Sequence, residues 1–146
     1  MKVEYKSPKE YVFGVPIFNK RGRITSRVRN GLENVLSAYS NISKMHARRT
    51  DNGRNNYRVK SVKIVGSGAK GVFTSDLDFL LLVPNLDVES ARNISLILAM
   101  IYFTDRPKLE AIDTYVRRED IFPERSSVDI SDQVKKLLKK YNKNLR

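Results

Sequence analysis

The fold of this chain is decided by residues 66–78, which read Gly66-Ser67-Gly68-Ala69-Lys70-Gly71-Val72-Phe73-Thr74-Ser75-Asp76-Leu77-Asp78. A β-branched run at 62–65 precedes this stretch and a leucine-rich run at 76–83 begins at its end, and their composition predicts two strands. Glycine allows positive φ and a close approach of the backbone to a ligand, so the residues between the strands are predicted to form an anion-binding loop. Ser67 and Lys70 would add a hydroxyl donor and a positive charge beside that loop.

Carboxylates follow the loop in a pattern that suits a divalent metal. Asp76 and Asp78 alternate with apolar residues along the second predicted strand, so they share one face, about 7 Å apart. Asp129 lies between two β-branched residues in a further strand-like segment. Three converging carboxylates could hold two cations about 3.5–4 Å apart, as phosphoryl transfer requires. Asp113, in the predicted strand 109–116, is a rival for the third position, and we favour Asp129 because of the order of the motifs.

The stretch from residue 62 to about residue 134 resembles the DNA polymerase beta-like nucleotidyltransferase superfamily. That superfamily combines a hydrophobic-Gly-Ser motif with Asp-x-Asp and hydrophobic-Asp-hydrophobic motifs, which here read Gly66-Ser67, Asp76-Leu77-Asp78 and Val128-Asp129-Ile130. The order of motifs is most similar to archaeal CCA-adding enzymes and to non-templated poly(A) or uridylyl transferases. The loop before Asp-x-Asp is shorter than in many members, and the helical domain that grips the nucleobase in those enzymes is expected to be missing.

The resemblance implies an enzyme that transfers a nucleoside monophosphate from a nucleoside triphosphate to an acceptor hydroxyl, with Mg²⁺ or Mn²⁺ as cofactor. The implied nucleotide-binding residues are Gly66, Ser67, Lys70 and Ser75. The implied metal ligands and catalytic residues are Asp76, Asp78 and Asp129. Since the usual accessory domain is expected to be missing, we also expect a homodimer or a separate partner chain to complete the nucleotide pocket.

Two other functions stay open at this point. A minimal nucleotidyltransferase could act as the antitoxin of a toxin–antitoxin pair and modify a protein partner. Alternatively, the chain could be a nucleic-acid-binding module on the same scaffold without catalysis. The presence of all three acids together with the Gly-Ser pair speaks against a loss of catalysis.

The charge of the chain indicates a polyanionic partner. Its 28 Lys and Arg residues against 16 Asp and Glu give a net charge of +12, and nucleic acid is the commonest partner of such domains. We therefore predict a nucleic-acid acceptor. No apolar run reaches the ~20 residues of a membrane span, so a membrane partner is not expected. The chain contains no cysteine, which leaves the redox compartment unresolved, and a cytoplasmic, intracellular location is the default expectation.

Arginine-rich segments are the expected contact points for nucleic acid near the mouth of the site. The predicted nucleic-acid-binding residues are Arg48, Arg49, Arg54, Arg58, Arg117, Arg118 and Arg125. A further arginine cluster lies at the start of the first predicted helix, at Arg21, Arg23, Arg27 and Arg29.

Periodicity along the rest of the chain predicts the remaining elements. Apolar residues recur at helical spacing over 24–45 and 87–103, with Asp87 as the N-cap of the second helix, and a short helix is predicted at 132–141. Residues 44–58 are polar and cationic and are predicted to form a loop. Together with the strands, this pattern predicts a single α+β (α/β) domain over all 146 residues. It should contain a mixed, mainly antiparallel sheet with helices packed on one face.

Overall fold

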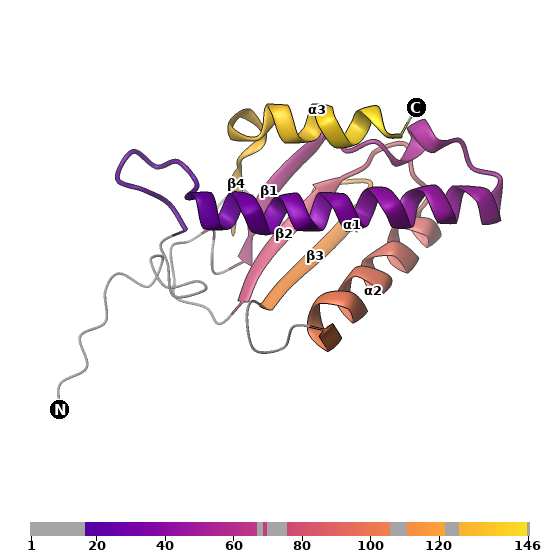
Figure 1. The fold of residues 1–146 in the computed structure, drawn as a ribbon, viewed down its shortest axis with the longest axis horizontal. Helices are drawn as coiled ribbons and strands as arrows, with labels where there is room; N and C mark the ends of the chain where they lie inside the picture. The colour runs from indigo at the N-terminus through magenta and orange to yellow at the C-terminus, as the bar shows by residue number, and fades with distance from the viewer. Residues whose placement is uncertain (1–16, 67–68, 70–75, 106–110, 122–125, 146) are drawn as a thin grey trace.

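A four-stranded sheet forms the centre of the protein in the computed structural model, which describes residues 17–66, 69, 76–105, 111–121 and 126–145. The strands are β1 (Ser61–Val65), β2 (Asp76–Leu82), β3 (Ala111–Arg117) and β4 (Ser127–Asp129). They lie in the order β3-β2-β1-β4 (Figure 1). β1 is antiparallel to β2 and to β4, and β2 is parallel to β3, so the predicted mixed, mainly antiparallel sheet is confirmed.

The helices cover one face of this sheet, as predicted. They are α1 (Ser26–Thr50), α2 (Val88–Asp105) and α3 (Lys135–Lys143), with short 3₁₀ turns η3 (Arg54–Tyr57) and η6 (Ser131–Gln133). α1 crosses the sheet and contacts both α2 and α3 (Figure 1). Gly31 allows α1 to lie close to β3, because a Cβ at this position would lie 3.2 Å from Cδ1 of Ile112 in β3.

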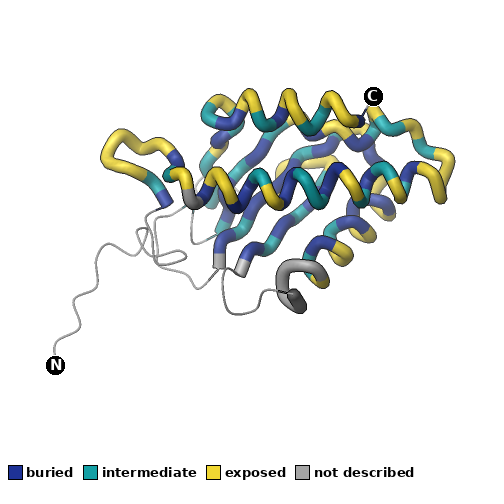
Figure 2. Tube along the Cα trace, in the orientation of Figure 1, coloured by how far each residue is buried: buried dark blue, intermediate teal, exposed yellow. Residues whose placement is uncertain are grey.

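The two faces of the sheet carry different side chains because neighbouring residues of a strand point to opposite sides. The face toward the helices is apolar and joins the hydrophobic core, with Val62, Ile64, Leu77, Phe79, Leu81, Ile112 and Val116 (Figure 2). Asp78 and Asp113 occupy the alternate positions in β2 and β3, as Lys63 does in β1. The candidate carboxylates therefore belong to the face away from the helices.

The predicted loop at 44–58 is wrong, since α1 continues to Thr50 and η3 follows it. Most residues in this region are polar, but Ala47 continues the buried side of the helix, and only 5% of its surface is exposed. The chain then turns back through Asp51, which has a left-handed φ of 59°. Tyr57 fixes the return: its carbonyl oxygen accepts a hydrogen bond from Tyr39 Oη (2.6 Å), and its hydroxyl lies 2.7 Å from His46 Nδ1.

The N-cap of α2 is as predicted. The Ser90 backbone N–H donates to Asp87 Oδ2 at 3.0 Å, which satisfies one of the free donors at the helix start. Hydrogen bonds from the Ser90 side chain and backbone lower the pKa of Asp87 below its usual value.

Within the described parts of the chain, none of the helices has the length and apolarity that a membrane crossing needs.

Candidate active site

The candidate site begins where β1 ends, at Gly66. This residue has a φ of +74°, and a Cβ built on it would lie 3.0 Å from Asp78 Oδ2. A non-glycine residue would thus be strained by its φ and would also press on the Asp78 carboxylate. One oxygen of that carboxylate, Oδ1, is buried. Glycine at this position therefore determines both the turn of the chain and the space beside Asp78.

Asp113 lies next to Asp78 in the sheet. The parallel register pairs Asp78 of β2 with Asp113 of β3, so their Cα atoms occupy directly paired positions about 4.8 Å apart and their side chains share the face away from the helices. Asp76 pairs with Ala111, two residues earlier on the same face, although its side chain lies outside the described part of the structure. The sheet topology thus brings the backbone positions of Asp76, Asp78 and Asp113 together.

The structure corrects the expected position of Asp129. β4 pairs with β1, not with β2, and places Asp129 opposite Lys63. Asp129 is therefore two strand spacings, about 10 Å, from β2, and it does not converge with Asp78. Its side chain is exposed and has a local structural role, because Oδ1 accepts a hydrogen bond from the Ser131 backbone N–H at 2.8 Å.

Lys63 separates Asp129 from the two paired carboxylates. It lies on β1 between the two acidic strands, and its ammonium group forms an ion pair with Asp120 from the segment that follows β3. Local sequence does not distinguish the two candidates for the third acid, because two segments share the pattern of an acid between strand-forming residues, Ile112-Asp113-Thr114 and Val128-Asp129-Ile130. The order along the chain does not reveal which of these strands lies beside β2.

The donor set suits a hard divalent cation. Two carboxylates at directly paired positions repel each other unless a cation or a proton neutralises them. Carboxylate oxygens are also the ligands that Mg²⁺ and Mn²⁺ prefer. Among the described side chains, which exclude that of Asp76, no three acidic or histidine groups come together in a metal-binding cluster. Asp78 and Asp113 are therefore the candidate metal ligands whose side chains the structure describes.

The predicted anion-binding loop is described only in part. Gly66 and Ala69 are described, and the Ala69 N–H donates to the Gly66 carbonyl oxygen at 3.2 Å, which closes a tight turn directly after β1. The predicted nucleotide-binding residues Ser67, Lys70 and Ser75 lie outside the described residues.

Four of the predicted nucleic-acid-binding arginines lie at the far end of the sheet. Arg48 and Arg49 belong to the last turn of α1, whereas Arg54 and Arg58 lie in or directly after η3. This end contains the first residue of β1 and the last residues of β2 and β3, opposite to the end with Gly66 and Asp78 (Figure 1). The expected position of these arginines near the mouth of the site is therefore wrong.

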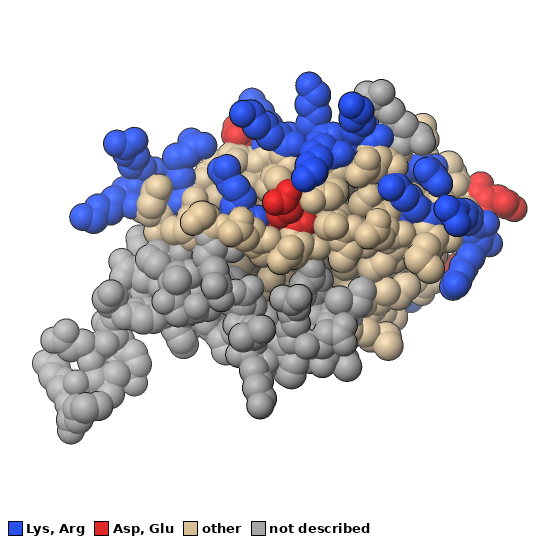
Figure 3. Space-filling view, viewed as in Figure 1, with Lys and Arg blue, Asp and Glu red and all other residues tan. Residues whose placement is uncertain are grey.

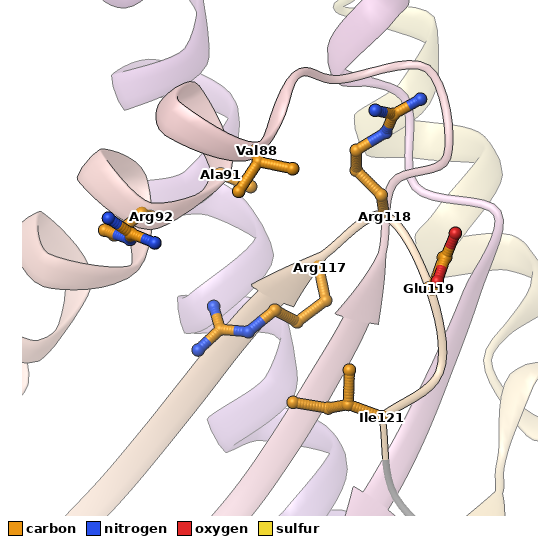
Figure 4. A pocket seen from close by; sticks show the side chains of 7 residues that line it. All are labelled: Val88, Ala91, Arg92, Arg117, Arg118, Glu119 and Ile121. Atoms are coloured by element: carbon orange, nitrogen blue, oxygen red, sulfur yellow. The ribbon is translucent and has the colours of Figure 1, made fainter.

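Arg117 and Arg118 also lie at that far end. They line a pocket of about 330 Å³ between the start of α2 and the end of β3, together with Arg92 and Ile121 (Figure 4). The guanidinium of Arg117 is engaged within the protein, because Nη1 donates to Ser95 Oγ (3.1 Å) and to the Val116 carbonyl oxygen (2.8 Å).

Arg118 differs from Arg117 in its direction. It extends away from Arg117, so the two side chains do not converge on a common point (Figure 4). Arg125, the last of the predicted arginines, lies outside the described residues.

Comparison of the whole chain with protein-family models, with curated proteins and with solved structures gave no match.

Proposed function

We propose that this protein transfers a nucleoside monophosphate from a nucleoside triphosphate to an acceptor hydroxyl. The observation that carries the proposal is the in-register pair of Asp78 and Asp113 on parallel strands, beside the glycine that ends β1. The motif order of residues 66–78 supports the same chemistry, with Asp113 in the position that the sequence had suggested for Asp129.

The acidic residues would act as the cation-binding set. Asp76, Asp78 and Asp113 would hold Mg²⁺ or Mn²⁺ through oxygen ligands, and the paired Asp78 and Asp113 would accept the cations more readily because their own repulsion is relieved. When bound, such cations would stabilise negative charge on the triphosphate and favour ionisation of the acceptor hydroxyl.

The glycine that ends β1 would serve the triphosphate. Because it has no side chain, Gly66 leaves open the space that a Cβ would fill beside Asp78 Oδ2.

In the proposed reaction, the acceptor oxygen would form a bond to the α-phosphorus while the α–β phosphoanhydride bond breaks. The hydroxyl proton would pass to solvent, and pyrophosphate would leave.

Transfer of label tests the proposal directly. The purified protein would be incubated with each α-labelled nucleoside triphosphate, with Mg²⁺ or Mn²⁺, and with single-stranded RNA, single-stranded DNA or protein as acceptor. We expect label on at least one acceptor and its loss in Asp78→Asn, a variant that keeps the shape of the side chain but lacks the charge. Equal labelling by the wild-type protein and Asp78→Asn, or no labelling of any acceptor, would contradict the proposal.

The nature of the labelled acceptor decides between the related functions. A labelled protein acceptor would favour the antitoxin-like function, whereas labelled RNA or DNA would favour a polynucleotide-extending enzyme. Binding of polynucleotide without any transfer would instead support the non-catalytic module.

A further inference from the structure

A basic turn precedes α1, and hydrogen bonds within the turn fix its conformation. Asn19 organises it: Oδ1 accepts hydrogen bonds from the N–H groups of Arg21 (2.9 Å) and Arg23 (3.1 Å). The Asn19 N–H donates to the Arg23 carbonyl oxygen at 2.7 Å, and Gly22 supplies the required positive φ of 75°. Lys20, Arg21 and Arg23 are thus presented on a turn with a defined conformation.

The turn is also anchored to the body of the protein. Ile17 and Ile24 flank it and are buried in the hydrophobic core. The Ile24 N–H donates to Gln133 Oε1 at 2.7 Å, and the Thr25 N–H donates to the Ile17 carbonyl oxygen at 3.0 Å. Since Gln133 lies two residues before the start of α3, the turn is fixed close to the first residues of that helix.

The positive charges of the turn are not neutralised within the described protein. Lys20, Arg21 and Arg23 are exposed, and no ion pair between described residues involves any of them. Arg117 at the far end is different, since its guanidinium is bound by the edge of the sheet and by α2. The charges of the turn are therefore available to a partner.

A basic strip continues from the turn along α3. We define the strip by its exposed cations, which are Lys20, Arg21, Arg23, Arg29, Lys136 and Lys139. Arg29 joins the two parts, because its Nη2 donates to the Gln133 carbonyl oxygen at 3.1 Å. Lys and Arg gather over the turn and over α3 in Figure 3, and the turn lies at the same end of the molecule as the start of β2 in Figure 1.

We propose that the basic strip binds the phosphodiester backbone of a single-stranded polynucleotide and leads its end toward the candidate active site. Cations fixed at intervals along a surface match a chain of phosphates, and such contacts supply affinity without reading the base sequence. The role of this polynucleotide as acceptor rests on the proposed function, whereas its binding can be measured without turnover.

The surroundings of the strip favour nucleic acid over a lipid surface. Peripheral membrane binding combines basic residues with large apolar side chains on the same surface. The large apolar side chains exposed in the described protein lie on α1, on α2 and after β3, and not on the turn or α3; they are Met45, Val88, Leu96, Ile97, Met100 and Ile121. The strip therefore offers charge without an apolar component.

Fluorescence anisotropy with a labelled single-stranded 12-mer, as RNA and as DNA, tests the proposal across a range of NaCl concentrations. The test variant is Lys20→Gln/Arg21→Gln/Arg23→Gln. The matched variant is Arg48→Gln/Arg49→Gln/Arg54→Gln, which lowers the net charge equally, from +12 to +9, at the far end. All six side chains are solvent-accessible and make no described ion pair, so both variants should fold, which circular dichroism and thermal melting would check.

We expect the turn variant to lose affinity and salt dependence, and the matched variant to lose little of either. Each lost phosphate contact lowers the log–log salt slope by about 0.7, so three contacts lower it by about 2. At 0.1 M salt this corresponds to a loss of affinity on the order of 10- to 100-fold.

Four results would overturn the proposal. They are equal losses in the two variants, no loss in the turn variant, no binding of RNA or DNA even at low salt, and turn-dependent binding to phosphatidylserine vesicles without binding to polynucleotide. If nucleotide transfer to a protein or a small acceptor persists in any of these cases, the proposed function stands while this inference fails.

A second variant tests whether the shape of the turn matters. Asn19→Ala removes the acceptor of two backbone hydrogen bonds but leaves all the charges in place. We expect a loss of affinity of about 3- to 10-fold with an unchanged salt slope, because the phosphate contacts remain and only their preorganisation is lost. An affinity equal to that of the wild-type protein would mean that a defined turn is not required, and would overturn this part of the proposal.

Discussion

Asp113 in β3 and Asp129 in β4 stand in similar sequences but in different surroundings. Each lies between residues that favour a strand, and each side chain belongs to the face of the sheet away from the helices. Asp113 is directly paired with Asp78, whereas Asp129 is paired with Lys63 and binds the backbone of Ser131. The same local pattern thus provides a candidate metal ligand in one strand and a turn-stabilising acid in the other.

This difference shows that the neighbouring strand decides the chemistry of an acidic residue. A carboxylate beside another carboxylate attracts cations, because binding relieves their repulsion. A carboxylate beside a backbone N–H stabilises a turn and needs no ligand. The two aspartates therefore form a natural pair of test and control positions.

The largest expected effect is on nucleotide transfer. Asp113→Asn should lower the transfer rate by at least about 100-fold, since loss of a ligand that stabilises charge on the phosphates costs several kcal/mol. Asp129→Asn should leave the rate within about 3-fold of the wild-type value, because the amide oxygen can still accept the Ser131 N–H. Initial rates at saturating triphosphate would measure both. A severe loss in Asp129→Asn with full activity in Asp113→Asn would restore Asp129 as the third ligand.

Cation binding should distinguish the same pair without turnover. Mn²⁺ at about 100 times its dissociation constant should stabilise the wild-type protein by about 2.7 kcal/mol, seen as a rise of several degrees in the melting temperature. The rise should persist in Asp129→Asn and be strongly reduced in Asp113→Asn. Mn²⁺ titrations followed by thermal melting would measure it, and an equal rise in all three proteins would place the cation elsewhere.

Two glycines with nearly the same φ allow a further test of the site beside Asp78. Gly66 has a φ of +74° and Gly22 a φ of +75°, but only at Gly66 would a Cβ have a close neighbour among the described residues, Asp78 Oδ2. Both alanine variants should lose about 1–2 kcal/mol of stability from backbone strain.

The two alanine variants should differ in Mn²⁺ binding. Gly66→Ala should weaken it, because the added methyl group presses on the Asp78 carboxylate. Gly22→Ala should bind Mn²⁺ as the wild-type protein does. Chemical denaturation and Mn²⁺ titration of both variants would measure the two effects, and normal Mn²⁺ affinity in Gly66→Ala would show that Gly66 serves the turn alone.

The smallest effects concern the metal-free protein and should have opposite signs. In EDTA, Asp113→Asn should raise the free energy of unfolding by about 0.2–1 kcal/mol, because a like-charge pair is removed. Asp129→Ala should lower it by about 0.5–1.5 kcal/mol through loss of the hydrogen bond to Ser131. Urea unfolding at neutral pH would measure both. A loss of stability in Asp113→Asn would mean that its carboxylate supports the fold.

Much of the fold could be predicted from local patterns. The strand from Asp76, the cap at Asp87 and the helices on one face all follow from alternation, capping chemistry and helical spacing. The length of α1 could not be predicted, because the burial of Ala47 and Tyr57 becomes apparent only in the folded core. The polar residues around Ala47 made the segment resemble a loop.

Part of the candidate site could be predicted from the amino-acid sequence alone. Gly66, Asp76 and Asp78 are close along the chain, and strand alternation places the two acids on one face. Only the tertiary structure decided which further acid lies beside them and where the positive charges lie. The order β3-β2-β1-β4 places Asp113 against Asp78 and Asp129 beyond Lys63, and the length of α1 places Arg48 and Arg49 far from Gly66. The physical reason is that strand pairing depends on backbone hydrogen bonds and on the burial of the whole sheet, and residues distant in sequence contribute to both.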